Sequence, residues 1–233
     1  MMARLQRLCP ANIPQHIIQR GNNRQPCFTQ EQDFITYTTY LKECADKFEV
    51  KIHAWVFMTN HVHLLCTPKE NNGVSKMMQG LGRKYVHYFN KKNARTGTLW
   101  EGRFKSCIIE SDAYLLQVYR YIELNPVRAR MVTSPEEYKW SSYQINALGK
   151  NSDLCSPHPL YLSLGATTAI RLCEYMKLFM NLLNVSQIND IRNSTNKNLA
   201  LGSELFKKEI EHLTGRRVFA RKRGRSKMGS ESN

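Results

Sequence analysis

The stretch VKIHAWVFMTNHVHLLCT (residues 50–67) decides the fold, because it places two runs of β-forming residues around a short polar turn. Residues 50–57 and 62–67 are rich in β-branched, aromatic and other apolar side chains, which favour strands. Thr59 and Asn60, which lie between the runs, suit a turn. The stretch therefore predicts an antiparallel hairpin.

Helices and further strands flank this hairpin. Residues 13–20 (IPQHIIQR) predict a strand that ends at the turn-forming Gly21-Asn22-Asn23. Apolar residues recur at spacings of three and four over residues 30–48 and 74–90, which predicts two amphipathic helices. Residues 104–109 predict a fourth strand.

A third helix is expected to begin at Ser111 and to end near Asn125, because Pro126 follows. The order is then β-α-β-β-α-β, an α+β ferredoxin-like core with an antiparallel sheet, followed by this added helix. Polar residues at 141–158 indicate a connector, and apolar periodicity within residues 170–183 and 205–213 indicates a helical C-terminal extension.

The charge balance points to a polyanionic partner, of which nucleic acid is the leading candidate. The 233 residues contain 34 lysines and arginines against 19 acidic residues, a formal charge of +15. No apolar run is long enough to cross a membrane or to act as a secretion signal, so we expect a cytoplasmic protein without a membrane partner. Seven scattered cysteines without a CxxC pair indicate neither a disulfide framework nor a zinc site.

His61-Val62-His63 is the sharpest chemical feature. Alternation along a strand places both imidazoles on one face, about 7 Å apart at Cα, where they can converge on one metal ion. The third helix offers two partner pairs at a spacing of four residues: Tyr121 with Asn125, and Tyr119 with Glu123. Spacing alone does not choose between the two pairs.

Three separated runs resemble a known family. HAWVFMTNHVHLLCTP (residues 53–68), LWEGRFK (residues 99–105) and YRYIELNPVRARMV (residues 119–132) are similar to the single-tyrosine HUH transposases, and specifically to the REP-associated tyrosine transposases of bacteria. The resemblance covers residues 8–145. The stretch from GSELF to GRRVFARKRGRSK (residues 202–227) resembles the C-terminal extension of longer members.

This resemblance implies a metal site and a nucleophile. His61 and His63 would bind Mg²⁺ or Mn²⁺, Asn125 would complete the site, and Tyr121 would attack the DNA. The implied activity is that of a metal-dependent endonuclease and strand transferase on single-stranded DNA, acting at hairpin or REP-type palindromes through a 5′-phosphotyrosine. The rival interpretation is a regulator that binds hairpin DNA without cutting it.

Several basic and polar residues are candidates for binding DNA. Trp100 either stacks on an unpaired base or anchors the core. The candidates are Arg20, Asn22, Asn23 and Arg24 in the first turn, Arg103 and Lys105 before the fourth strand, and Arg221, Arg223 and Arg225 near the C-terminus.

The sequence divides into three expected parts. Residues 1–145 form the HUH transposase catalytic domain, residues 146–215 a connector and small helical extension, and residues 216–233 a basic DNA-binding tail. His16, His53, His87, His158 and His212 are expected to be structural or solvated. The oligomeric state is either monomer or homodimer.

Overall fold

The structure is a computed structural model that describes residues 7–181 and 183–219. A five-stranded sheet with the order β2-β3-β1-β4-β5 forms its centre. The first four strands pair antiparallel, and β5 adds parallel to β4. The strands are β1 (Gln15–Arg20), β2 (Val50–Met58), β3 (His61–Pro68), β4 (Lys105–Ile109) and β5 (Ala200–Leu201).

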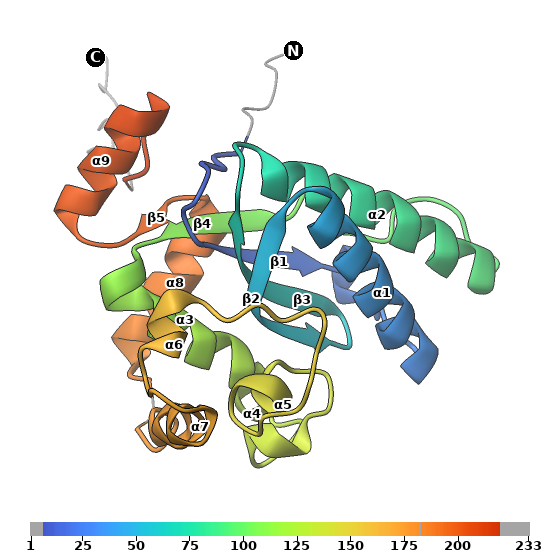
Figure 1. The fold of residues 1–233 in the computed structure, drawn as a ribbon. Helices are drawn as coiled ribbons and strands as arrows, with labels where there is room; N and C mark the ends of the chain where they lie inside the picture. The colour runs from blue at the N-terminus through green and yellow to red at the C-terminus, as the bar shows by residue number, and fades with distance from the viewer. Residues whose placement is uncertain (1–6, 182, 220–233) are drawn as a thin grey trace, which may run out of the picture.

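Helices cover both faces of this sheet (Figure 1). The two long helices, α1 and α2, pack on one face, and α3 and α8 pack on the other. The long helices are α1 (Glu31–Lys47), α2 (Gly73–Lys92), α3 (Ser111–Glu123), α7 (Thr168–Lys177), α8 (Val185–Lys197) and α9 (Glu204–Thr214). Short ones are η1 (Asn22–Arg24), α4 (Asn125–Arg128), η2 (Pro135–Glu137), α5 (Tyr143–Asn146) and α6 (Pro159–Leu162).

The predicted α+β class and β-α-β-β-α-β order are confirmed. The hairpin of β2 and β3 turns at Thr59 and Asn60 as expected. The third helix ends at Glu123, before Pro126, and a short helix begins again at Asn125. Proline at the first turn of that short helix explains the break, since it lacks the N–H that a continuous helix needs.

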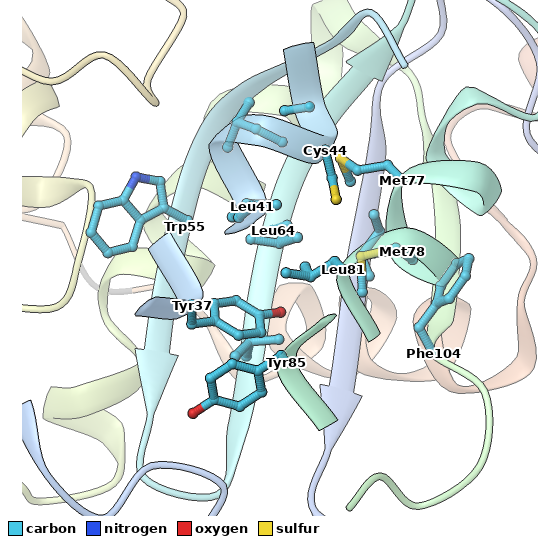
Figure 2. Packing of buried hydrophobic residues seen from close by; sticks show 14 of the residues in the cluster. Tyr37, Leu41, Cys44, Trp55, Leu64, Met77, Met78, Leu81, Tyr85 and Phe104 are labelled. Atoms are coloured by element: carbon cyan, nitrogen blue, oxygen red, sulfur yellow. The ribbon is translucent and has the colours of Figure 1, made fainter. Parts of the chain in front are cut away.

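The core between the sheet and the pair α1–α2 follows from apolar periodicity (Figure 2). Tyr37 and Leu41 of α1 and Leu81 and Tyr85 of α2 are fully buried against Leu64 of β3. Alternation along β3 sends Leu64 to this face and sends its neighbours to the other face. Burial of these side chains fixes which face of β3 is left for α3 and the site.

A β-bulge at His53 changes which side chains of β2 face each layer. Ile52 pairs with Cys66 and Ala54 pairs with Leu65, so His53 is the extra residue. A bulge of one residue moves the following side chains to the opposite face. Trp55 consequently packs on the α1–α2 side, together with Ile52.

The C-terminal half shares a core with the sheet. Tyr161, Tyr175 and Ile191 are buried in the same apolar cluster as Ile122 of α3. α8 packs on β4 and leads into β5, which extends the sheet. Among the described helices, none is long and apolar enough to cross a membrane.

Candidate active site

A cavity of about 440 Å³ opens on the α3 face of the sheet. Strands β1 and β3 form its floor, and α3, α4 and α8 form its walls. Its lining is mainly polar and basic: His16, Ile18, Arg20, Met58, His61, His63, Tyr121, Asn125, Arg128, Ala129, Arg192, Thr195 and Asn196.

The two histidines of β3 share this cavity. Alternation along the strand puts His61 and His63 on one face, and Val62 between them is buried on the other. The imidazole centroids of the pair lie 5.2 Å apart with the planes at 76°. The strand therefore presents two nitrogen donors to one space.

Tyr121 of α3 lies directly beside this pair. Its ring centroid is 5.8 Å from that of His63, and the two planes meet at 80°. The amide of Asn125, one turn further along the chain, donates from Nδ2 to the carbonyls of Tyr121 (3.0 Å) and Ile122 (3.2 Å). Because those carbonyls can only accept, the amide orientation is fixed and Oδ1 remains as a free oxygen ligand.

The alternative pair lies elsewhere. Tyr119 is 0% exposed and packs between Tyr161 and Tyr175. Glu123 is also fully buried, and it accepts hydrogen bonds from Ser142 (2.5 Å), Asn146 and Tyr175. The structure thus brings Tyr121 and Asn125 to the histidines and turns Tyr119 and Glu123 into the core.

A chain of hydrogen bonds fixes the tautomer of His63. The Thr195 hydroxyl donates to the Ile191 carbonyl (2.7 Å), so its oxygen accepts from Nδ1–H of His16 at 2.9 Å. Nε2 of His16 then has the lone pair and accepts from Nδ1–H of His63 at 2.8 Å. His63 is left with an unprotonated Nε2, the form that binds a metal ion.

His61 is fixed in the same way from the other side of the cavity. Nδ2 of Asn60 donates to the Arg24 carbonyl (3.1 Å), so Oδ1 of Asn60 accepts from Nδ1–H of His61 at 2.7 Å. Burial lowers the pKa of His61 to about 4, with the Arg20 charge adding to the effect, and burial also lowers the pKa of His63 well below its usual value. Both imidazoles are neutral at physiological pH, and the lone pair on Nε2 of each is available to a metal ion.

Arg128 supplies a cation next to the tyrosine. Its guanidinium lies 4.3 Å from the centroid of the Tyr121 ring, and Nη2 donates to the Tyr121 carbonyl at 2.6 Å. Burial lowers the Arg128 pKa to about 10, so the group stays charged at neutral pH. Its Nε and Nη1 atoms are buried and have no acceptor among the described residues. A buried cation with two unused donors is suited to an anion such as a phosphate.

The donor set fits a divalent ion. His61 and His63 offer two imidazole nitrogens and Asn125 offers an amide oxygen, all lining one cavity. Within the described residues no group of three or more histidine, cysteine, aspartate or glutamate side chains forms an alternative metal site. Imidazole with a carbonyl oxygen suits Mn²⁺, or Mg²⁺ with most ligands supplied by water and substrate.

The predicted DNA-binding residues take different positions. Arg20 lines both the cavity and a small hollow that it shares with Glu101, Arg103 and Lys105. Trp100 is 5% exposed and belongs to the core beneath α2, which favours its structural interpretation. Asn22, Asn23 and Arg24 form η1 at the end of β1, and Arg221, Arg223 and Arg225 lie outside the described residues.

Sequence reasoning missed three contributors to the cavity. His16 was expected to be structural or solvated, yet it lines the cavity and bonds His63. Arg128 was not singled out, and neither was α8, which adds Arg192, Thr195 and Asn196. A signal for α8 was present, because Asn184 and Gln187 form a capping box at its start.

Comparison with known proteins finds a family model and solved structures that are similar to this chain. Residues 10–125 match the family model of IS200-like transposases. The REP-associated tyrosine transposase solved with a REP hairpin shares the fold: it is 15% identical, the TM-score is 0.55, and the match covers 67% of this chain and 99% of that one. A candidate transposase from Deinococcus radiodurans R1 is 20% identical over 53% of this chain and 94% of its own, with a TM-score of 0.36.

A comparison with curated proteins finds no match. The cavity residues His61, His63, Tyr121 and Asn125 all fall within the matched segment, residues 10–125, whereas Arg128 and α8 lie beyond it. On the strength of that match, residues 10–125 of this chain are similar to the IS200-like transposase family.

Proposed function

We propose that this protein is a metal-dependent endonuclease and strand transferase that acts on single-stranded DNA beside a hairpin, as a REP-associated tyrosine transposase. The observation that carries the proposal is the meeting of Tyr121 with two neutral imidazoles, each holding a free Nε2, in one cavity. The relative of the same fold was solved on a REP hairpin, which supports this class of substrate.

In the proposed reaction, the phenolic oxygen of Tyr121 attacks the scissile phosphorus and the bond from phosphorus to the 3′-oxygen breaks. The products are a 5′-phosphotyrosine and a 3′-hydroxyl, which takes up the proton that the phenol loses. Attack by another 3′-hydroxyl reverses the step and joins strands without an external energy source. No water enters the reaction.

Arg128 is the residue that we assign to the phosphate. Its two buried, unpartnered donors lie next to the Tyr121 ring, where a non-bridging phosphate oxygen can accept from them. Fixed donors that meet developing negative charge lower the barrier because they need no reorganisation during the reaction. Arg192 of α8 lines the same cavity and adds positive charge.

His61, His63 and Asn125 are the residues that would hold the divalent ion. When bound, the ion would polarise the scissile phosphate and screen its charge. With two imidazole donors, the site is expected to function at a lower concentration of Mn²⁺ than of Mg²⁺.

The test is covalent capture of DNA. A labelled hairpin oligonucleotide with Mn²⁺ should give a protein–DNA species that survives denaturation, absent in Tyr121→Phe and retained in Tyr119→Phe. The control variant is well matched, because it removes the same hydroxyl group from a buried tyrosine of the same helix that does not line the cavity.

Two rival functions give different products. A hairpin-binding regulator would bind the oligonucleotide and leave it intact. A hydrolase whose water attacks directly would release free 5′-phosphate ends without any adduct. Either result from the unmodified protein would overturn the proposal.

A further inference from the structure

Helix α2 carries both paired and unpaired basic residues. Lys84 and Lys92 form ion pairs with Glu43 and Asp33 of α1. Arg83 and Lys91 are exposed, and within residues 7–181 and 183–219 neither forms an ion pair. Lys84 and Lys92 are therefore neutralised locally, whereas Arg83 and Lys91 are available to an anionic partner.

The unpaired charges line a groove. Arg83, His87 and Lys91 follow one another every four residues along one edge of a hollow of about 840 Å³, and Arg95 lies at its end. A spacing of four residues puts successive side chains about 6 Å apart along a helix. The row from Arg83 to Lys91 thus extends about 12 Å, a length over which one strand of a duplex carries three or four phosphates.

Two buried polar atoms on the groove residues lack partners. Trp100 Nε1 and Asn90 Oδ1 have no hydrogen bond within the described part of the chain, although both residues line the groove. One is a donor and the other an acceptor, so a polar ligand or the water around it can satisfy both. Apolar side chains of Met78 and Val86 complete the lining.

The groove and the candidate active site are joined through the first turn. Trp100 pairs with Gly21, Asn22 N–H donates to the Leu99 carbonyl (2.8 Å), and Glu101 N–H donates to the Arg20 carbonyl (2.8 Å). Arg20 in turn lines the active-site cavity on the opposite face of the sheet. The backbone at the end of β1 thus links the residues of one site to those of the other.

We propose that the α2 groove binds the sugar-phosphate backbone of the DNA hairpin stem, while the adjoining single strand turns past Arg20 into the active site. The proposal rests on the proposed function, since it assigns part of the same substrate to a second surface. The row of unpaired cations supplies charge complementarity to the stem, and contacts of this kind position DNA without reading its sequence.

The experiment measures binding without cleavage. Fluorescence anisotropy of a labelled hairpin is followed against salt concentration in the Tyr121→Phe background without divalent ions. In this background Arg83→Gln/Lys91→Gln is compared with Lys42→Gln/Lys84→Gln, which also removes two positive charges but from residues that pair with acids on the α1 side.

The Arg83→Gln/Lys91→Gln protein should bind the hairpin about tenfold more weakly at low salt, and its log–log salt slope should fall by about 1.8, or 0.9 per lost phosphate contact. The control pair should change affinity by less than about twofold. Equal effects of the two pairs would overturn the proposal. An equal loss on an oligonucleotide without a stem would also overturn it, since the groove would then bind single-stranded DNA.

Failure of the catalytic proposal gives a different signature. With Tyr121 restored, the Arg83→Gln/Lys91→Gln protein should still form the covalent adduct on a saturating hairpin. If the unmodified protein forms no adduct but the two variant pairs show the expected salt slopes, the catalytic function is refuted. The proposed stem site is then still supported.

Discussion

Nδ1 of His63 lies 2.8 Å from Nε2 of His16, and the two imidazole planes are within 5° of parallel. The two residues come from neighbouring strands, because His16 pairs with Leu65, two positions from His63. Beyond His16 the chain of hydrogen bonds reaches Thr195 and the Ile191 carbonyl of α8. A helix more than 120 residues away in the sequence therefore orients a candidate metal ligand.

Thr195→Val tests this connection, because valine keeps the shape but removes the acceptor of the His16 Nδ1–H. We expect the concentration of Mn²⁺ that half-saturates adduct formation to rise 10- to 100-fold, the usual cost of losing an outer hydrogen bond to a metal ligand. Titration of Mn²⁺ by electron paramagnetic resonance should show the same weakening. Thr195→Ser retains the hydroxyl and serves as the control; equal behaviour of the two variants would contradict the assigned role.

Arg128→Gln tests the phosphate contact. Loss of the buried guanidinium should lower the rate of adduct formation at saturating DNA by about 100-fold or more, as for other fixed donors to a developing anion. Arg130→Gln removes the same charge from an exposed position two residues away. Single-turnover kinetics measure both, and a similar small loss in each would mean that Arg128 acts only through net charge.

Mixing two inactive variants tests whether one chain supplies the whole site. Tyr121 and His63 of the same chain have ring centroids 5.8 Å apart, and α3 is anchored by the buried Leu115, Val118 and Ile122. A mixture of His63→Ala and Tyr121→Phe should therefore give no adduct above that of either variant alone. Recovery of the adduct would show that tyrosine and histidines from different chains combine.

Glu123 makes stability depend on pH. Burial raises its pKa to about 7, against the hydrogen bonds from Ser142, Asn146 and Tyr175 that favour the ionised form. The folded state thus holds a proton that the unfolded chain releases near pH 4.5, so this residue's contribution to stability is lost as pH rises from about 4.5 to about 7.

Glu123→Gln should remove that dependence. Between pH 5.5 and pH 8, the free energy of unfolding of the variant relative to the parent should rise by about 2 kcal/mol. Denaturant titrations at the two pH values measure it, with the exposed Glu209→Gln as the control for a lost charge. An unchanged difference between variant and parent would mean that Glu123 is ionised in the folded protein throughout this range.

The sequence predicted those parts of the fold in which apolar residues recur with a strong period. Residues 50–67 alternate around a turn, and α1 and α2 have apolar stripes long enough to stand out from chance. By contrast α8 buries little beyond Ile191 and Thr195, so its apolar signal is weak although its capping box is clear. Polar helices that pack through a few residues escape a periodicity argument.

Of the site, the sequence predicted only those relationships that depend on residue spacing within one strand or one helix. His61 and His63 share a face because a strand alternates, and Tyr121 shares a helix with Asn125 because four residues make about one turn. The choice of Tyr121 over Tyr119 came from family resemblance; in the structure Tyr121 lies beside His63 in the cavity, and Tyr119 packs against Tyr161 and Tyr175. His16 could not be found in this way, because its bond to His63 depends on the register between β1 and β3.

The proposed reaction depends most directly on which tyrosine carries the DNA. Trypsin cleaves after Lys105, Arg120 and Arg128, so Tyr119 falls in the peptide 106–120 and Tyr121 in the peptide 121–128. After reaction with the hairpin and Mn²⁺ and digestion of the DNA to a nucleotide, fragment-ion mass spectrometry should place the phosphonucleotide on Tyr121. A nucleotide on Tyr119 or on any other residue would contradict the account.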